Sequence, residues 1–140
     1  MHAVYNEFSV SRHPLLQGAF GSIDGLNLPY ETSDDIEFEN ATYNGWLHAH
    51  FISSVLVFSG TGLIVSGCFN CPGDWHDSHV AQPVYKKLLQ DTPHGYYLVA
   101  DTVFLCGTDQ IKGKIRVLMK AGQKLPGAAQ ALEEHLWFNR

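Results

Sequence analysis

Short runs of apolar and β-branched residues recur along the chain and predict four strands. The first covers residues 18–28 and is closed by Pro29. Residues 47–58 and 63–69 flank a Ser-Gly-Thr-Gly turn and predict a β-hairpin. Residues 96–100 are wholly apolar, which is typical of a strand buried on both faces. The pattern therefore predicts an antiparallel start followed by a buried strand.

Helical spacing appears in the second half of the chain. Residues 78–90 predict a helix that Asp77 or Ser78 caps, with Val80, Val84 and Leu88 on its apolar side. Residues 111–119 predict a short helix and a strand, and 128–137 predict a further helix. Together with the strands, this order predicts an α/β fold built on a mixed sheet.

The first 17 residues are poorly patterned and predict an N-terminal remnant or linker, with the end of a helix before the His13-Pro14 break. Residues 18–140 predict one domain. Residues 31–40 are acidic and polar, which indicates a solvated loop or a single helical turn.

Charge, cysteine content and hydropathy limit which classes of function and which cellular environment the chain suits. The formal net charge is −5, which argues against an autonomous DNA-binding surface, because duplex binding depends mainly on Lys and Arg. Three cysteines do not form an even-numbered disulfide framework, so we expect a reducing, intracellular environment. No apolar run approaches the length of roughly 20 residues that a membrane span needs.

Two aspartates follow β-type runs, namely Asp24 and Asp101. Carboxylates at the carboxyl ends of neighbouring strands meet at one edge of a sheet and repel each other unless a cation or a proton intervenes. Oxygen ligands favour Mg²⁺ or Mn²⁺. A structural interpretation stays open, because Asp-Gly and strand-end aspartates are also common turn formers.

Five segments, in this order, carry a resemblance: GSIDGLNLP, ENATYNGW, NCPGDWHDSHVAQPVYKKL, GYYLVADTVF and QIKGKIRVLMKAGQKLP. They resemble the DDE superfamily endonuclease domain of PIF/Harbinger-type transposases, particularly fungal members, over nearly the whole chain. The most specific feature is the Pro-Gly-x-x-His-Asp-Ser box between the two aspartates.

This resemblance implies an RNase H-like fold and metal-dependent cleavage and transfer of DNA strands. It implies that Asp24 and Asp101 are catalytic metal ligands and that Asp77 supports the metal or caps the loop. It further implies a Mg²⁺ or Mn²⁺ cofactor, DNA as the substrate of the complete enzyme, and a nuclear location. The oligomeric state stays open.

The family's third acid is a glutamate on a later helix, and the resemblance places it beyond Arg140. Glu133 and Glu134 are weaker candidates, because their neighbours do not match that helix. We therefore expect a chain that is truncated before the catalytic glutamate and inactive alone, and whose DNA contacts could come from a separate DNA-binding partner.

Two alternatives stay open. The first is a domesticated, non-catalytic binding protein. The second is a small zinc module, because Cys68, Cys71, His76 and His79 have zinc-ligand chemistry, although their spacing is wrong for a zinc finger. The separate His-x-His pair at 48 and 50 indicates structural histidines, since no third ligand is local.

Overall fold

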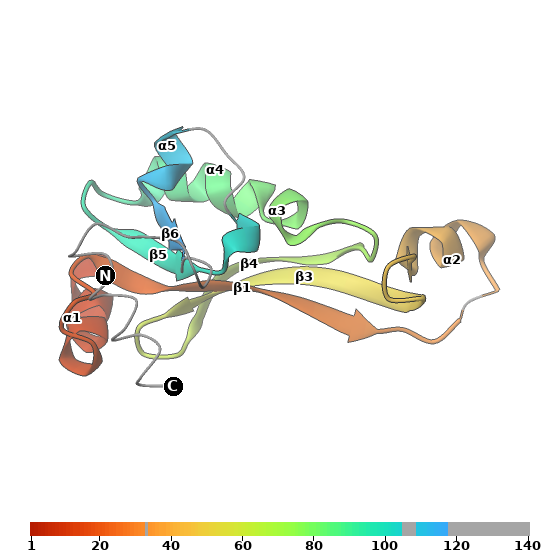
Figure 1. Cartoon of the computed structure of the whole chain (residues 1–140), viewed down its shortest axis with the longest axis horizontal. Coiled ribbons are helices and arrows are strands. Elements are labelled where there is room, and N and C mark those ends of the chain that lie inside the picture. The colour runs from red at the N-terminus through yellow and green to blue at the C-terminus, as the bar shows by residue number, and fades with distance from the viewer. Residues whose placement is uncertain (33, 105–108, 118–140) are drawn as a thin grey trace, which may run out of the picture.

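A mixed sheet carries helices α3, α4 and α5 on one face, and α1 and α2 lie at its opposite ends (Figure 1). The computed structural model describes residues 1–32, 34–104 and 109–117. In chain order the elements are α1 (His2–Arg12), β1 (Ala19–Pro29), α2 (Ile36–Thr42), β2 (Tyr43–Asn44), β3 (Ala49–Ser59), β4 (Ile64–Pro72), α3 (Asp77–Val80), α4 (Gln82–Asp91), β5 (Tyr97–Ala100), the 3₁₀ turn η1 (Thr102–Phe104), α5 (Asp109–Lys112) and β6 (Ile115–Val117). None of these described helices is long and apolar enough to cross a membrane.

The sheet begins antiparallel and ends parallel, as the sequence predicts. Its order is β2-β3-β1-β5-β6, and β4 pairs with β3. Strand β3 is antiparallel to β1, β2 and β4, whereas β5 is parallel to both β1 and β6. The predicted α/β class with a mixed sheet is therefore confirmed for the described residues. The helix predicted over 128–137 lies outside them.

The pairing of β1 with β3 is the longest in the sheet. It runs from Gly21 opposite Ser59 to Pro29 opposite Phe51. The far half of this ribbon extends beyond β5 and β6 and ends at α2 (Figure 1). As a result, β1 continues past Asp24 to Pro29, which confirms the strand predicted over residues 18–28 and places Asp24 within the strand and not at its end.

The main core lies between the sheet and the helices on its covered face. Its most buried members include Val55 on β3, Leu98 on β5 and Phe104 on η1. The predicted apolar side of the 78–90 helix is confirmed, because Val80, Val84 and Leu88 are all buried. Burying such side chains contributes about 1.5–3 kcal/mol each relative to leaving them exposed.

The structure has two helices where the sequence predicts one. Residues 78–90 divide at Ala81 into α3 and α4, and Pro83 stands in the first turn of α4. Proline has no N–H to donate, so it is tolerated where a helix begins and not in its interior. The predicted cap is also wrong: α3 begins at Asp77, and the cap residue His76 makes no side-chain capping bond.

The opposite face carries a smaller core of Leu16, Ala19 and Tyr97. Tyr97 alternates with Leu98 along β5, which places it on the other face of the sheet. The side-chain amide of Asn6 on α1 donates to the carbonyl oxygens of Leu16 at 3.1 Å and Ala19 at 2.8 Å. These two bonds join α1 to the start of the sheet.

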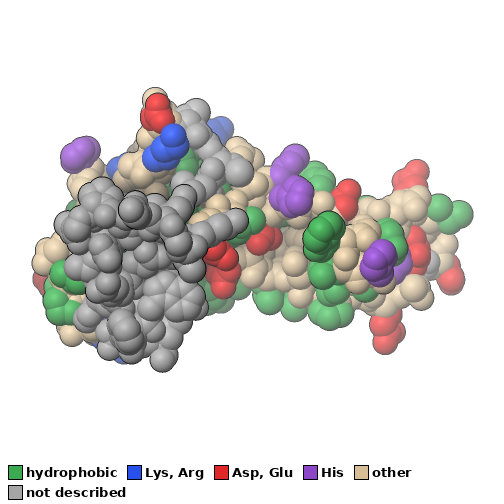
Figure 2. All heavy atoms as spheres, in the orientation of Figure 1, with side chains coloured by type: hydrophobic (Ala, Val, Ile, Leu, Met, Phe, Trp, Pro, Cys, Tyr) green, Lys and Arg blue, Asp and Glu red, His purple; other side chains and the backbone are tan. Residues whose placement is uncertain are grey.

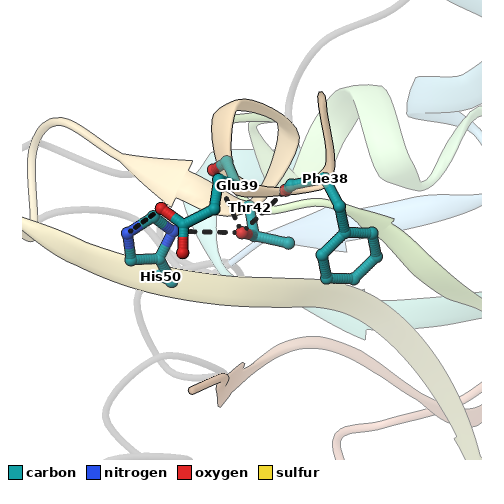
Figure 3. Close-up of polar contacts among 4 residues, drawn as sticks. All are labelled: Phe38, Glu39, Thr42 and His50. Atoms are coloured by element: carbon teal, nitrogen blue, oxygen red, sulfur yellow. Dashed lines mark hydrogen bonds and ion pairs between the residues drawn. The ribbon is translucent and has the colours of Figure 1, made fainter. Parts of the chain in front are cut away.

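The acidic segment forms the helix α2, which is longer than the predicted single turn. The carboxylate of Asp35 accepts hydrogen bonds from the N–H groups of Glu37 and Phe38, which satisfies two N-terminal donors. His50 joins α2 to β3 (Figure 3). Its Nδ1 lies 3.1 Å from the Thr42 hydroxyl, and its Nε2 lies 3.5 Å from the Glu39 carboxylate.

These contacts make His50 a structural residue, as the sequence indicates. His48 differs: it precedes β3, is exposed and has a φ of 51°. The alternation of the two histidines with apolar neighbours predicts that they share one strand face, and this is wrong, because His48 precedes β3 and only His50 lies in it.

Candidate metal centre

Parallel pairing brings two aspartates to the same level of the sheet. The last paired residues of β1 and β5 are Ile23 and Ala100. Asp24 follows Ile23 along β1, and Asp101 follows Ala100, the last residue of β5. Both side chains are exposed, and they start from neighbouring parallel strands. The sheet therefore brings Asp24 beside Asp101 at the carboxyl end of β5.

The chain after Asp101 is anchored in the core. Oδ1 of Asp101 accepts hydrogen bonds from the N–H of Thr102 at 2.5 Å and from its hydroxyl at 3.2 Å. Phe104, three residues after Asp101, is fully buried, and its carbonyl oxygen accepts a hydrogen bond from the Tyr85 hydroxyl of α4 at 3.1 Å. The η1 turn thus fixes an exposed carboxylate on a rigid base.

Asp77 approaches the same region from the covered face. Its carboxylate lies directly against Gly25, the residue after Asp24, where a Cβ would overlap it. Burial raises the pKa of Asp77 above its ordinary value of 3.8, the negative charge of Asp24 raises it further, and His76 lowers it by a smaller amount. Asp24 and Asp77 therefore form a repelling pair of carboxylates.

The three aspartates all fall within one sequence match. A family model described as a DDE superfamily endonuclease matches residues 23–140. The chain belongs to this family. The match begins one residue before Asp24 and covers Asp77 and Asp101. Searches of curated proteins and of solved structures found no match.

The donor types in this DDE endonuclease domain fit a divalent cation, although the side chains do not form a closed site. Within the described parts of the chain, no group of three or more His, Cys, Asp or Glu side chains is close enough to hold a metal ion. His76 lowers the pKa of Asp77 and so offsets the repulsion from Asp24 only in part. The carboxylates of Asp24 and Asp101 are both exposed.

The structure brings together only two of the four candidate zinc ligands, Cys68 and Cys71. The sulfur atoms of Cys68 and Cys71 lie 3.5 Å apart. The ring of His79 instead stacks on Trp75, with centroids 4.2 Å apart. The described residues thus bring no third ligand to the two sulfurs.

Three residues at the site have no distinct signal in the sequence. The Asp-Gly pair is typical of a turn in sequence, yet Gly25 lies within β1 and makes room for Asp77. Tyr85 and Phe104 appear only as apolar positions, and their hydrogen bond joins segments 19 residues apart. A pattern of apolar residues identifies burial and does not identify this partner.

The raised pKa of Asp77 has a measurable consequence. The folded protein holds this proton more tightly than the unfolded chain does, so stability falls as pH rises from the ordinary carboxyl pKa through the raised one. Above the raised pKa, Asp77 is ionised in the folded protein and its full destabilising effect is present. We expect Asp77→Asn to raise Tm by about 3 °C at pH 7 and to give no gain well below pH 3.8, where the carboxyl is protonated in both the folded and the unfolded state.

Thermal melts followed by circular dichroism at the two pH values measure this effect. Asp74→Asn, which changes an exposed carboxyl in the same loop, is the matched control and leaves Tm unchanged. A Tm gain for Asp77→Asn that persists at the acidic pH contradicts the electrostatic cause.

Proposed function

We propose that this chain is a transposase-derived nuclease domain of PIF/Harbinger type, with an RNase H-like fold. Asp24 and Asp101 hold a divalent cation, Mg²⁺ or Mn²⁺, and Asp77 supports it from the covered face. In the complete enzyme this site cleaves and transfers DNA phosphodiesters. The observation that carries the proposal is the placement of Asp24 and Asp101 directly after paired residues of adjacent parallel strands.

Strand order supports the fold assignment. Strands β4, β3 and β1 form an antiparallel set, and β5 and β6 continue the sheet in parallel beyond β1. This is the order expected of an RNase H-like core from the resemblance. Helices α3 and α4 follow the antiparallel set and precede β5, which gives the crossover that a parallel connection requires.

The electrostatics of the three aspartates support the cation. Asp24 and Asp77 repel each other, and this repulsion is part of what raises the pKa of Asp77. A divalent ion removes the repulsion and favours the ionised carboxylates. Carboxylates whose pKa is shifted by burial and by a neighbouring like charge are typical of functional sites, where ligand binding offsets the destabilising repulsion.

The chemistry supplied by such a cation is activation of the attacking oxygen and stabilisation of the leaving one. The chain's own residues have separate tasks. Asp24 and Asp101 hold the ion from two rigid strands, which fixes its position relative to the sheet. Asp77 adds negative charge from the half-buried side. Tyr85, through Phe104, positions the backbone that carries Asp101.

Cation binding is the first test of this function. We expect millimolar Mn²⁺ to raise Tm by several degrees, because an ion that binds only the folded state stabilises it by mass action. The same melt with Ca²⁺ in place of Mn²⁺ tests whether the site prefers the smaller ion. EDTA is expected to restore the Tm of the metal-free protein. The absence of any Mn²⁺ effect on Tm or on titration heat argues against the site. We expect no nicking of supercoiled plasmid by this chain alone, and Mn²⁺-dependent nicking that is lost in Asp101→Ala would overturn that expectation.

Gly25→Ala tests the part assigned to Asp77. The φ of Gly25 is not in the left-handed region, so the backbone accepts alanine, and the added methyl displaces the Asp77 carboxylate. We expect Mn²⁺ affinity to fall about tenfold, while Tm without metal changes by less than about 2 °C.

Gly45→Ala is the matched control for this variant, because a Cβ there meets only an ordinary contact at 3.9 Å in the α2 region. It leaves Mn²⁺ affinity unchanged. Equal Mn²⁺ affinity in Gly25→Ala and in wild type contradicts a role for Asp77 at the site.

DNA is the proposed substrate, and the proposed location is the nucleus. The family supports DNA as the substrate in general. The net charge of −5 provides little electrostatic attraction for a duplex, and few Lys and Arg side chains are visible on the described part of the face in Figure 2. We therefore propose that basic segments outside the described residues, or a separate DNA-binding partner, bring the DNA to the site.

A second candidate is a non-catalytic binding protein. Exposed aromatic side chains near α2 favour it, with Trp46 at 91% exposure and Tyr30, Phe38 and Tyr43 partly exposed. Exposed apolar groups of this size mark interaction surfaces in many proteins. A protein partner retained after Asp24 and Asp101 are both changed to Asn favours this candidate over the nuclease.

A further inference from the structure

Cys68 and Cys71 lie on an irregular part of β4. Cys68 pairs with Val55 of β3 and Cys71 pairs with Ser53, so three steps along β4 face two steps along β3. Between them, Asn70 has a φ of 57°, in the left-handed region that asparagine tolerates better than most residues. This is a β-bulge, which inserts one extra residue into a strand.

The bulge brings together two thiols that a regular strand would separate. Residues three apart on a regular strand point to opposite faces. Here the sulfur atoms of Cys68 and Cys71 are 3.5 Å apart, in hydrogen-bond contact. Both side chains are partly buried against the main core, and both remain partly open to solvent.

We propose that Cys68 and Cys71 form a redox-active dithiol, a covalent modification site at which the two sulfur atoms join in a reversible intramolecular disulfide. The oxidant is a small disulfide of the glutathione class. In a reducing environment the dithiol is the resting form, and oxidation closes it.

The reaction balances as two exchanges. The thiolate of Cys68 attacks one sulfur of the oxidant, a mixed disulfide forms, and the first small thiolate leaves. Cys71 then loses its proton and attacks the sulfur of Cys68, which expels the second small thiolate. Two protein thiols are oxidised, one small disulfide is reduced to two thiols, and the two protein protons end on the products.

Geometry and environment assign the two roles. Burial, then the hydrogen bond with Cys68 and the charge of Cys68, raise the pKa of Cys71 to about 11. Cys71 therefore holds its proton more tightly than an ordinary cysteine does, and its sulfur lies in contact with that of Cys68. The attacking residue is Cys68, and the resolving residue is Cys71.

Mass spectrometry after alkylation tests the site. Cys106, which lies outside the described residues, is replaced by serine in every protein. The Cys106→Ser protein is equilibrated with mixtures of reduced and oxidised glutathione, quenched with acid and alkylated. We expect one oxidised species that lacks two hydrogen atoms, carries no alkyl group and stays monomeric.

Single variants separate the two roles. Cys71→Ser should accumulate a stable glutathione adduct on Cys68, because the resolving thiol is gone. Cys68→Ser should form its adduct about tenfold more slowly, because burial still holds Cys71 in the protonated form. Circular dichroism confirms that each variant is folded.

Asn70→Val tests the bulge, with Asn70→Gly as the matched control. A β-branched residue disfavours the left-handed conformation, so Asn70→Val should weaken disulfide formation about tenfold, whereas Asn70→Gly leaves it unchanged. The proposal is overturned if both thiols of the Cys106→Ser protein are alkylated at every glutathione ratio. Stable adducts on both cysteines, or a disulfide between two molecules, overturn it as well.

Discussion

Asp101→Asn is expected to weaken Mn²⁺ binding by at least about 100-fold, because it removes a charged ligand and leaves a neutral one. The substitution keeps an oxygen that accepts the bonds from Thr102, so the η1 turn keeps its geometry. Asp101 is exposed, and stability without metal should change by less than about 0.5 kcal/mol. Asp24→Asn should have the same effect on the cation. Isothermal titration with Mn²⁺ measures both.

Asp109→Asn is the control for these two substitutions. Asp109 is exposed on α5, where it pairs with Lys112 at 2.9 Å. Its replacement removes the same charge from the protein and should leave Mn²⁺ affinity unchanged. A similar loss of affinity in all three variants would show that Mn²⁺ responds only to net charge, which contradicts a specific site at Asp24 and Asp101.

Phe104→Ala is expected to cost about 3–5 kcal/mol of unfolding free energy, since the side chain is fully buried and leaves a cavity. Domains of this size have roughly 5–15 kcal/mol in total, so much of the stability is lost. The substitution also loosens the turn that follows Asp101, and the Tyr85 hydroxyl bond to residue 104 weakens with it. Urea denaturation followed by circular dichroism measures the loss.

Val103→Ala is the matched control for Phe104→Ala. It lies in the same turn, one residue earlier, and its side chain is 39% exposed. Its cost should stay within about 0.5 kcal/mol. Equal costs for Val103→Ala and Phe104→Ala contradict the packing of η1 into the core.

The sequence predicts most of the sheet, because strands of this chain are apolar, β-branched and separated by turn residues. The β3–β4 hairpin and the buried β5 are confirmed with small changes at their ends. Asp101 is at its expected place, since β5 is short and ends at Ala100. The position of Asp24 is not predictable in this way, because it depends on how far β1 pairs with β3, and that is a tertiary property.

Two further features depend on contacts between distant segments. Asp77 reaches Gly25 across more than fifty positions of sequence, and only the close approach of two segments shows why glycine stands there. The bulge in β4 depends on its register with β3, so the sequence identifies two cysteines and does not show that their sulfurs meet. Local propensity describes single elements, whereas both sites arise where elements meet.

The most direct test of the metal site is anomalous diffraction from crystals of this chain soaked in Mn²⁺. We predict a manganese peak within about 2.2 Å of carboxylate oxygens from both Asp24 and Asp101, with Asp77 bound to the ion directly or through a water molecule. A structure that has no peak there while manganese binds elsewhere, for example between Glu39 and His50, would contradict the assignment of Asp24 and Asp101 as the metal ligands.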